Sequence, residues 1–507
     1  MQSLGFWEDL SGTIPARLQI ENNLQDYEHL FKEYREITQI MLLASAKLRS
    51  IAYHDLEAAE IDELEVNERG VALRVFRDHS QEIFLKAYCL FVRYYGDTGA
   101  ETILQIILQA LTDGENDQHS AEACFFAAKS IYDAFSDEGP PGPKVAVFVT
   151  RLVEFIVTNQ QSIQSFIVAK QILLFIEQAA KLLIEFKQYH SQLLQYMLRV
   201  YRTFDRLQTL ALQAVHELSE HCKYSFTGED VNLLHSFLTQ HYRAMSREHA
   251  ALLMATIAQS MSILSPGAEL RASVAQITVI PLKALTEATQ ETDRLEIMKA
   301  TAVLSGCVES VSDLPGLVVE EALQGLFDKV WPPLGKVLKE RAFDHEVITE
   351  ACTLIGEVFK ALRSQLASYH TPVQLSLLEA FVQSPKNFEC LKKVAELVAI
   401  MGKADAAASA RISQSVDQLI GVILPNVVKP PKPNQQAESF VDRIDCDVVS
   451  AFADLLTNIV SLDPAAFVDA KHFDQSVDLL CEVLGTVSEK GAQGAIVSLF
   501  LMVTQSL

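Results

Sequence analysis

Residues 207–222, with the sequence LQTLALQAVHELSEHC, decide the fold that we predict for this chain. Apolar side chains recur there every three or four residues, so they fall on one side of an α-helix with about 3.6 residues per turn. The stripe consists of Leu207, Leu210, Ala211, Ala214, Val215, Leu218 and Cys222. Most of the residues between them are polar. The stretch therefore predicts an amphipathic helix that packs one face against a neighbour.

The same spacing returns along the rest of the chain, at residues 168–186, 297–311 and 390–398. Short segments with Pro or Gly separate such stretches, and Pro is tolerated in the first turn of a helix but not inside it. We therefore expect helices to begin or end at residues 138–143, 265–267, 314–316, 331–333 and 370–372. No segment shows a convincing alternation of apolar and polar residues, so the predicted fold class is all-α.

The chain has 507 residues, which is too many for one compact core. Paired amphipathic helices in units of about 40 residues are typical of HEAT and armadillo repeats. We expect residues 1–507 to form a single continuous α-solenoid, a right-handed superhelix of HEAT-like or armadillo-like hairpins. Two longer loops are predicted within it, an acidic loop at 55–68 and a Pro-rich loop at 429–436. Several independent helical bundles are the alternative, and they would require linkers that the sequence lacks.

The chain is strongly acidic, with 65 Asp and Glu residues against 42 Lys and Arg residues and a formal net charge of −23. This charge disfavours direct nucleic-acid binding and docking on anionic membranes, because both need clustered basic residues. It suits a basic protein partner, although acidity also simply keeps proteins soluble. The eight cysteines form no CxxC pair, and no apolar segment is long enough to span a bilayer. These features favour a reducing compartment, the cytoplasm or the nucleus.

Motifs of catalysis are absent from the sequence. We find no GxxxxGK[ST], GxGxxG, HExxH or GxSxG pattern. His216 and His221 are five residues apart, which is a poor spacing for sharing a metal ion on one helix face. Acidic residues are so abundant that a carboxylate pair formed in space stays open. We predict that the protein is not an enzyme and has no catalytic residue, metal or cofactor.

Six segments, in order along the chain, resemble the transportin-SR and importin-13 branch of the importin-β (karyopherin-β) superfamily. They are 4–10 with its Phe-Trp pair, 76–84, 122–131, 211–222, 328–334 with its Trp-Pro element, and 423–425 followed by 445–452. Each likeness is weak residue by residue, and it is the conserved order of the six that carries the resemblance. A different HEAT-repeat protein that shares generic helix patterns is the alternative.

The resemblance implies a nuclear transport receptor that binds protein cargo on a concave face. It also implies contacts with Phe-Gly nucleoporins, shuttling between cytoplasm and nucleus through the nuclear pore, and control by the GTPase Ran. Such receptors are longer than this chain, and their first repeats bind Ran. We therefore expect a fragment that lacks the N-terminal Ran-binding repeats and the C-terminal end. The expectation also rests on residues 496–507, which end within an apolar helix although solenoids need a polar capping repeat.

The resemblance also singles out one helix, at residues 347–360. In the transportin-SR branch the corresponding helix is rich in arginine and grips phosphorylated Arg-Ser tails. At the arginine positions this chain has Glu350, Thr353, Gly356 and Lys360. We therefore predict an acidic cargo-facing surface that includes Glu346, Glu350 and Glu357, with Lys360 as the one remaining cation, and that meets basic protein cargo. A solvated helix face without a ligand is the alternative.

A HEAT-repeat scaffold or regulatory subunit without a transport role is the alternative function. A uniform repeat consensus with Asp/Arg ladders between repeats would favour the scaffold. The sequence shows no such consensus.

Overall fold

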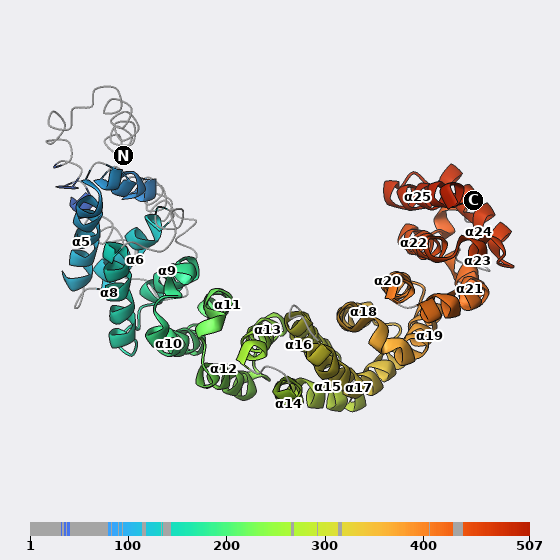
Figure 1. Cartoon of the computed structure of the whole chain (residues 1–507), viewed down its shortest axis with the longest axis horizontal. Helices are drawn as coiled ribbons and strands as arrows, with labels where there is room; N and C mark the ends of the chain where they lie inside the picture. Colours follow the sequence, from blue (N-terminus) through green and yellow to red (C-terminus); the bar gives the residue numbers. More distant parts are fainter. Residues whose placement is uncertain are drawn as a thin grey trace, which may run out of the picture. The chain divides into compact units, whose positions relative to one another are not determined.

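The computed structural model confirms the all-α class in the part of the chain that it describes (Figure 1). Described are residues 32, 35, 36, 38–40, 80–82, 84–89, 91–93, 95–113, 118–132, 134, 143–264, 268–291, 293–312, 317–404, 406–428 and 440–506. Within these ranges no strand occurs, and one isolated β-bridge joins Val428 to Ile444. The predicted loops at 55–68 and 429–436 lie outside the described residues.

The chain forms two compact units, Met1–Leu233 and Leu234–Leu507. The first unit contains α5 (Asp97–Asp113), α6 (Gln118–Ser130), α8 (Pro143–Asn159), α9 (Phe166–Leu183), α10 (His190–Thr203) and α11 (Gln208–Cys222). Helices α6, α9 and α11 contact one another in turn, and so do α5, α8 and α10. The first unit therefore has two layers of helices. The boundary between the units falls within α12 (Gly228–His241).

The second unit repeats this arrangement over a longer stretch of chain. Its B layer, in which each helix contacts the next, consists of α13 (Arg247–Leu264), α16 (Arg294–Ser312), α18 (His345–Leu362), α20 (Phe388–Ala404), α22 (Cys446–Leu462) and α25 (Lys490–Ser506). Its A layer consists of α14 (Ala268–Ile277), α15 (Val279–Glu291), α17 (Leu317–Glu340), α19 (Ala367–Gln383), α21 (Ala406–Val427), α23 (Pro464–Val468) and α24 (Phe473–Thr486). Antiparallel hairpins such as α17/α18 and α19/α20 join the layers. That the two units form one continuous array stays a prediction.

The predicted apolar stripes form the interface between the layers. In α11 and at its N-cap residue Leu207, every member of the predicted stripe is buried except Leu210. In α16 the side chains on the stripe from Ile297 to Val311 are buried as well. Each hairpin thus removes its apolar face from water by stacking on its neighbours, as expected for a helical-repeat protein. This burial, rather than intrinsic helix propensity, supplies most of the stability of such helices.

Two of the predicted helix breaks are wrong. Residues Pro332 and Pro333 lie inside α17, and Pro372 lies inside α19. A proline removes one backbone donor and leaves a carbonyl four residues earlier without its partner. In α17 those carbonyls belong to the exposed residues Asp328 and Lys329, so water can replace the lost bonds and the helix continues. By contrast, α13 ends at Leu264, α14 begins at Ala268 and α17 begins at Leu317, close to the predicted breaks at 265–267 and 314–316.

In the second unit, polar side chains of one hairpin donate hydrogen bonds to backbone carbonyls of the preceding hairpin. The Lys299 ammonium on α16 donates to the carbonyl of Tyr242 and lies 4.5 Å from the centre of its ring. Nδ2 of Asn458 on α22 donates to the carbonyl of Ala395 at 3.0 Å. Asn387 makes the same kind of bond to Ala342. Burial lowers the pKa of Lys299, so the carbonyl and the ring compensate for lost hydration.

Candidate functional site

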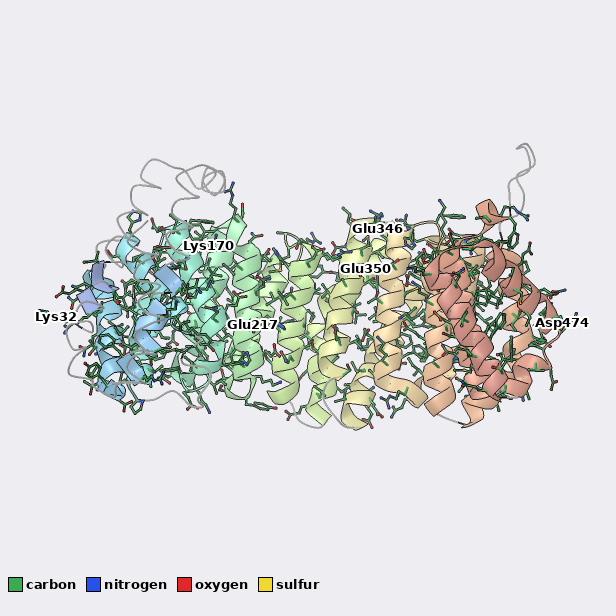
Figure 2. All side chains as sticks on the ribbon, turned by 90° about the horizontal axis from the view of Figure 1, so that it is seen from above. Lys32, Lys170, Glu217, Glu346, Glu350 and Asp474 are labelled. Carbon is green, nitrogen blue, oxygen red and sulfur yellow. The ribbon has the colours of Figure 1, made fainter. Side chains whose placement is uncertain are left out.

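The predicted cargo-facing helix is α18, and its first turn is fixed by Asp344. The Asp344 side chain occupies the N-cap position and accepts from the backbone N–H of Val347 at 3.4 Å. Beyond this cap, Val347, Ile348, Ala351 and Ile355 turn into the core. The predicted residues therefore share the outward side of α18. Figure 2 shows Glu346 and Glu350 close together near the N-terminal end of the helix.

The four predicted residues differ in exposure. The side chains of Glu346 and Lys360 are 65% and 55% exposed, whereas those of Glu350 and Glu357 are 22% and 23% exposed. Glu346 and Lys360 are thus open to solvent, whereas Glu350 and Glu357 are largely covered by their neighbours. The acidic face that the sequence predicts is therefore less accessible than its spacing suggests.

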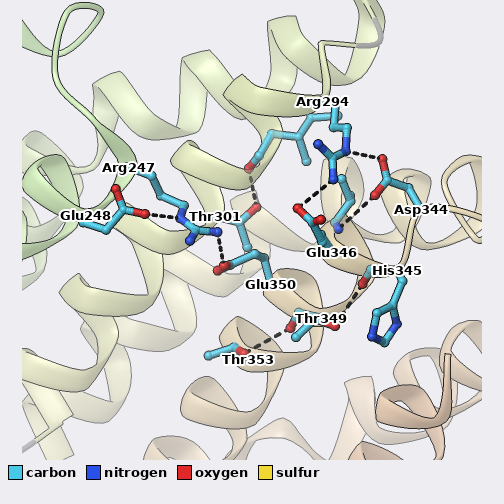
Figure 3. A network of polar contacts seen from close by, with 12 residues as sticks. Arg247, Glu248, Arg294, Thr301, Asp344, His345, Glu346, Thr349, Glu350 and Thr353 are labelled. Carbon is cyan, nitrogen blue, oxygen red and sulfur yellow. Dashed lines mark hydrogen bonds and ion pairs between the residues drawn. The ribbon is translucent and has the colours of Figure 1, made fainter.

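Arginines from two preceding B-layer helices neutralise the N-terminal part of this face (Figure 3). Arg294 on α16 donates from Nε to Asp344 at 2.7 Å and from Nη2 to Glu346 at 2.7 Å. Arg247 on α13 donates from Nη1 to Glu350 at 2.6 Å and from Nε to Glu248 at 3.0 Å. Sequence reasoning missed both arginines. They lie far along the chain from their partners, and only the stacking of α13, α16 and α18 brings them together.

The carboxyl group of Glu350 is subject to opposing influences. Burial raises the pKa of its carboxyl group, the Arg247 guanidinium lowers it, and nearby Glu248 raises it again. Arg247 therefore helps to keep this half-buried carboxylate charged. A ligand cation that takes the place of Arg247 at Glu350 would have to supply the same stabilisation.

At the other end of α18 the charges are balanced as well. Lys360 pairs with Glu357 at 2.9 Å, and this hydrogen bond raises the pKa of Lys360, with Glu396 and Glu309 adding to the effect. On α20, Lys393 pairs with Glu396 at 2.5 Å. A Cβ atom at Gly356 would collide with the Lys393 ammonium, so glycine at this position allows α18 and α20 to pack around a lysine.

A cavity of about 640 Å³ lies on the A-layer side, between the end of α12, helix α15 and the start of α16. Val279, Ile280, Ala284 and Ala288 give it an apolar wall, and Val279 is 56% exposed. Charged residues, among them Lys283 and Glu287, which lie 3.6 Å apart, line its rim. An apolar pocket with a charged rim is suited to the side chain of a peptide. The sequence analysis did not predict it.

Neither metal-binding nor membrane-spanning features appear in the described ranges. No group of three or more His, Cys, Asp or Glu side chains is placed to hold a metal ion in that part of the chain. His221, one of the two histidines considered above, instead lies 3.8 Å from Glu217 on the same helix. Among the described helices, none combines the length and the apolar composition needed to cross a bilayer.

Comparison with known proteins adds a fold likeness but no sequence match. No protein-family model matches the chain, and no curated protein matches it. A solved structure of importin-13 in its cytosolic state is similar, with a TM-score of 0.62 and 15% identity over 99% of this chain and 60% of that one. Kap121p bound to Pho4p (TM-score 0.56) and to RanGTP (0.54) are also similar, each at 13% identity over 97% of this chain and 51% of theirs.

Two stacked layers of helical hairpins define the molecule as a helical-repeat protein. Its fold is that of the karyopherin structures, importin-13 and Kap121p. The chain spans about 60% of the importin-13 structure and about half of the Kap121p structures.

Proposed function

We propose that this protein acts as a karyopherin-type nuclear transport receptor of the transportin-SR and importin-13 branch. In this proposal residues 1–507 form one array that carries protein cargo through the nuclear pore, shuttles between cytoplasm and nucleus, and responds to RanGTP. The observation that carries the proposal is the fold likeness to importin-13 over 99% of the chain. Kap121p, which has a similar fold, has been solved bound to RanGTP, to Nup53p and to Pho4p, and these structures support the proposal.

Binding of a Phe-Gly repeat peptide is the test that separates a transport receptor from a scaffold. We expect a peptide phenylalanine to enter the A-layer cavity and contact Ala284. Ala284→Glu places a carboxylate on the apolar wall and should weaken binding about tenfold or more, as expected for losing the burial of one phenylalanine. The measurement is fluorescence anisotropy with a labelled peptide.

The control variant is Ala272→Glu, because Ala272 is an exposed alanine of α14 that does not line the cavity. It should bind the peptide as the unmodified protein does. A peptide in which serine replaces every phenylalanine should not bind. If the serine peptide binds equally well, or if the Phe-Gly peptide does not bind, the transport proposal fails at this step.

For the cargo we propose a basic segment that binds along α18. Such a segment would exchange with Arg294 for the exposed carboxylate of Glu346. The exchange is feasible because exposed ion pairs contribute only about 0–1 kcal/mol, so little stability is lost when one partner is replaced by another cation. The net charge of −23 would steer a basic cargo toward the protein.

An unphosphorylated Arg-Ser peptide should therefore bind more tightly than its phosphorylated form. Glu346→Lys should weaken this binding, whereas Glu340→Lys, a change at a 49% exposed glutamate of the A layer, should not. Isothermal titration calorimetry at low and at moderate salt gives both affinities and their salt dependence. Tighter binding of the phosphorylated peptide would refute the basic-cargo proposal and leave the Phe-Gly result unaffected.

One observation favours the scaffold as a second candidate. Arg294–Asp344 and Arg247–Glu350 are arginine–carboxylate pairs between different helices of the B layer. They resemble the Asp/Arg ladder that is expected of a scaffold and that is not recognisable as a repeated sequence pattern. A scaffold would bind its partner without any requirement for Phe-Gly peptide or RanGTP. The peptide test above therefore decides between the two candidates.

A further inference from the structure

A second, smaller cavity lies between α14 and α17 in the A layer of the second unit. Its volume is about 60 Å³, enough for several water molecules or one small ion. Small or apolar residues such as Ala275, Ala322 and Leu326 form most of its wall, and Arg271 of α14 and Lys329 of α17 line it as well. No carboxylate lines this cavity. Two exposed cations thus line the mouth of a small cavity whose wall carries no counter-charge.

Neither cation is engaged elsewhere in the described structure. Across the described ranges Arg271 and Lys329 form no ion pair, whereas Lys336 on the same helix pairs with Glu340 at 3.8 Å. The carboxylate of Asp328, next to Lys329 in sequence, accepts instead from the Tyr369 hydroxyl at 2.9 Å. Both cations are therefore available to an anionic ligand.

The facing helix holds the arginine in place. A Cβ atom at Gly325 would lie 3.4 Å from Nε and 3.6 Å from Nη2 of Arg271, so the guanidinium packs directly over this glycine. A larger residue at 325 would occupy the space between the two helices. Thr278 lines the same cavity, and its hydroxyl donates a hydrogen bond to the carbonyl of Val274 at 2.7 Å. The hydroxyl oxygen of Thr278 can still accept a hydrogen bond from a ligand.

We propose that Arg271 and Lys329 form a binding site for a phosphate-type oxyanion. The planar guanidinium can donate two parallel hydrogen bonds to such an anion, and the ammonium adds a compact charge. An anion in the cavity would be attracted by both cations. The ligand is either free phosphate or the phosphomonoester of a phosphorylated side chain. The site is independent of the proposed cargo surface, because it lies in the other layer of helices.

The experiment uses the whole chain and two ligands, inorganic phosphate and a phosphoserine peptide, with binding followed by calorimetry at constant pH and ionic strength. Arg271→Gln or Lys329→Gln should weaken binding about tenfold each, since a hydrogen bond to a charged group is lost. Lys336→Gln is the matched control on α17 and should bind as the unmodified protein does. Ala275→Glu keeps both cations but supplies an internal carboxylate, and it should abolish binding.

Binding of either ligand that follows this pattern supports the site. Binding of phosphate alone identifies the free ion as the ligand, and binding of the phosphopeptide shows that a phosphorylated side chain reaches the cavity. The proposal is overturned if neither ligand binds, if the double Gln variant binds as well as the unmodified protein, or if chloride at the same ionic strength gives the same signal. Circular dichroism of each variant checks that the helices are intact.

Discussion

Replacing Phe327 by alanine is expected to lower the free energy of unfolding of the second unit by about 3–5 kcal/mol. The Phe327 side chain on α17 is fully buried. Its ring centre lies 5.9 Å from that of Trp331, 6.1 Å from that of Phe359 on α18 and 5.1 Å from that of Tyr369 on α19. The substitution removes both the buried apolar surface and the edge-on ring contacts, and it leaves a cavity where three helices meet.

Phe343→Ala is the matched control for this prediction, because Phe343 lies in the turn between α17 and α18 and is 81% exposed. It should change stability by no more than about 0.5 kcal/mol. Urea denaturation gives the difference, and hydrogen exchange shows whether the loss is confined to the hairpins around Phe327, since repeat proteins can unfold in parts. Equal losses for the two variants would contradict the packing that we describe.

The second large effect is a loss of stability in acid that depends on His370. This side chain on α19 is 6% exposed, and its Nε2 has no hydrogen-bond partner in the described structure. Burial lowers the pKa of His370 from 6.5 to about 4, with a smaller contribution from Arg411. The unfolded chain therefore binds a proton at a higher pH than the folded chain does. The resulting stabilisation is fully present above about pH 6.5 and is lost as the pH falls toward 4, and it amounts to about 3 kcal/mol.

The measurement compares the pH dependence of the unfolding free energy of the unmodified protein with that of His370→Leu, which cannot take up this proton. The variant should lose less stability than the unmodified protein between pH 6.5 and pH 4. Parallel curves for the unmodified protein and His370→Leu would show that His370 is protonated in the folded protein as readily as in the unfolded one.

The sequence predicted the fold well because the periodic stripes report burial directly. The stripe from Ile297 to Val311 reappears as the buried face of α16, and the stripe from Cys390 to Val398 as that of α20. The prolines were misread for a local reason. A proline pair leaves carbonyls unbonded, and in α17 these belong to exposed residues before Trp331, where water can bind them and the helix continues.

The candidate site was predicted less completely. The sequence predicts that Glu346, Glu350 and Glu357 belong to one acidic surface, and in the structure all three lie outside the buried stripe of α18. That this surface meets cargo stays a prediction. Neutralisation of this surface by Arg247 and Arg294 depends on which turn of one hairpin stacks beside which turn of the next. The periodicity of a single helix carries no information about that register. The same limit applies to the cavity beside Arg271, because its two cations belong to different hairpins.

The bonds from Lys299, Asn387 and Asn458 to backbone carbonyls have an evolutionary consequence. Every residue carries a carbonyl, so the accepting position can mutate freely while the alignment of adjacent hairpins is kept. At these three junctions only one polar donor has to be kept, and the rest of the interface needs only to stay apolar and of similar size. A fold held in this way tolerates extensive sequence change, and importin-13 has a similar fold at only 15% identity to this chain.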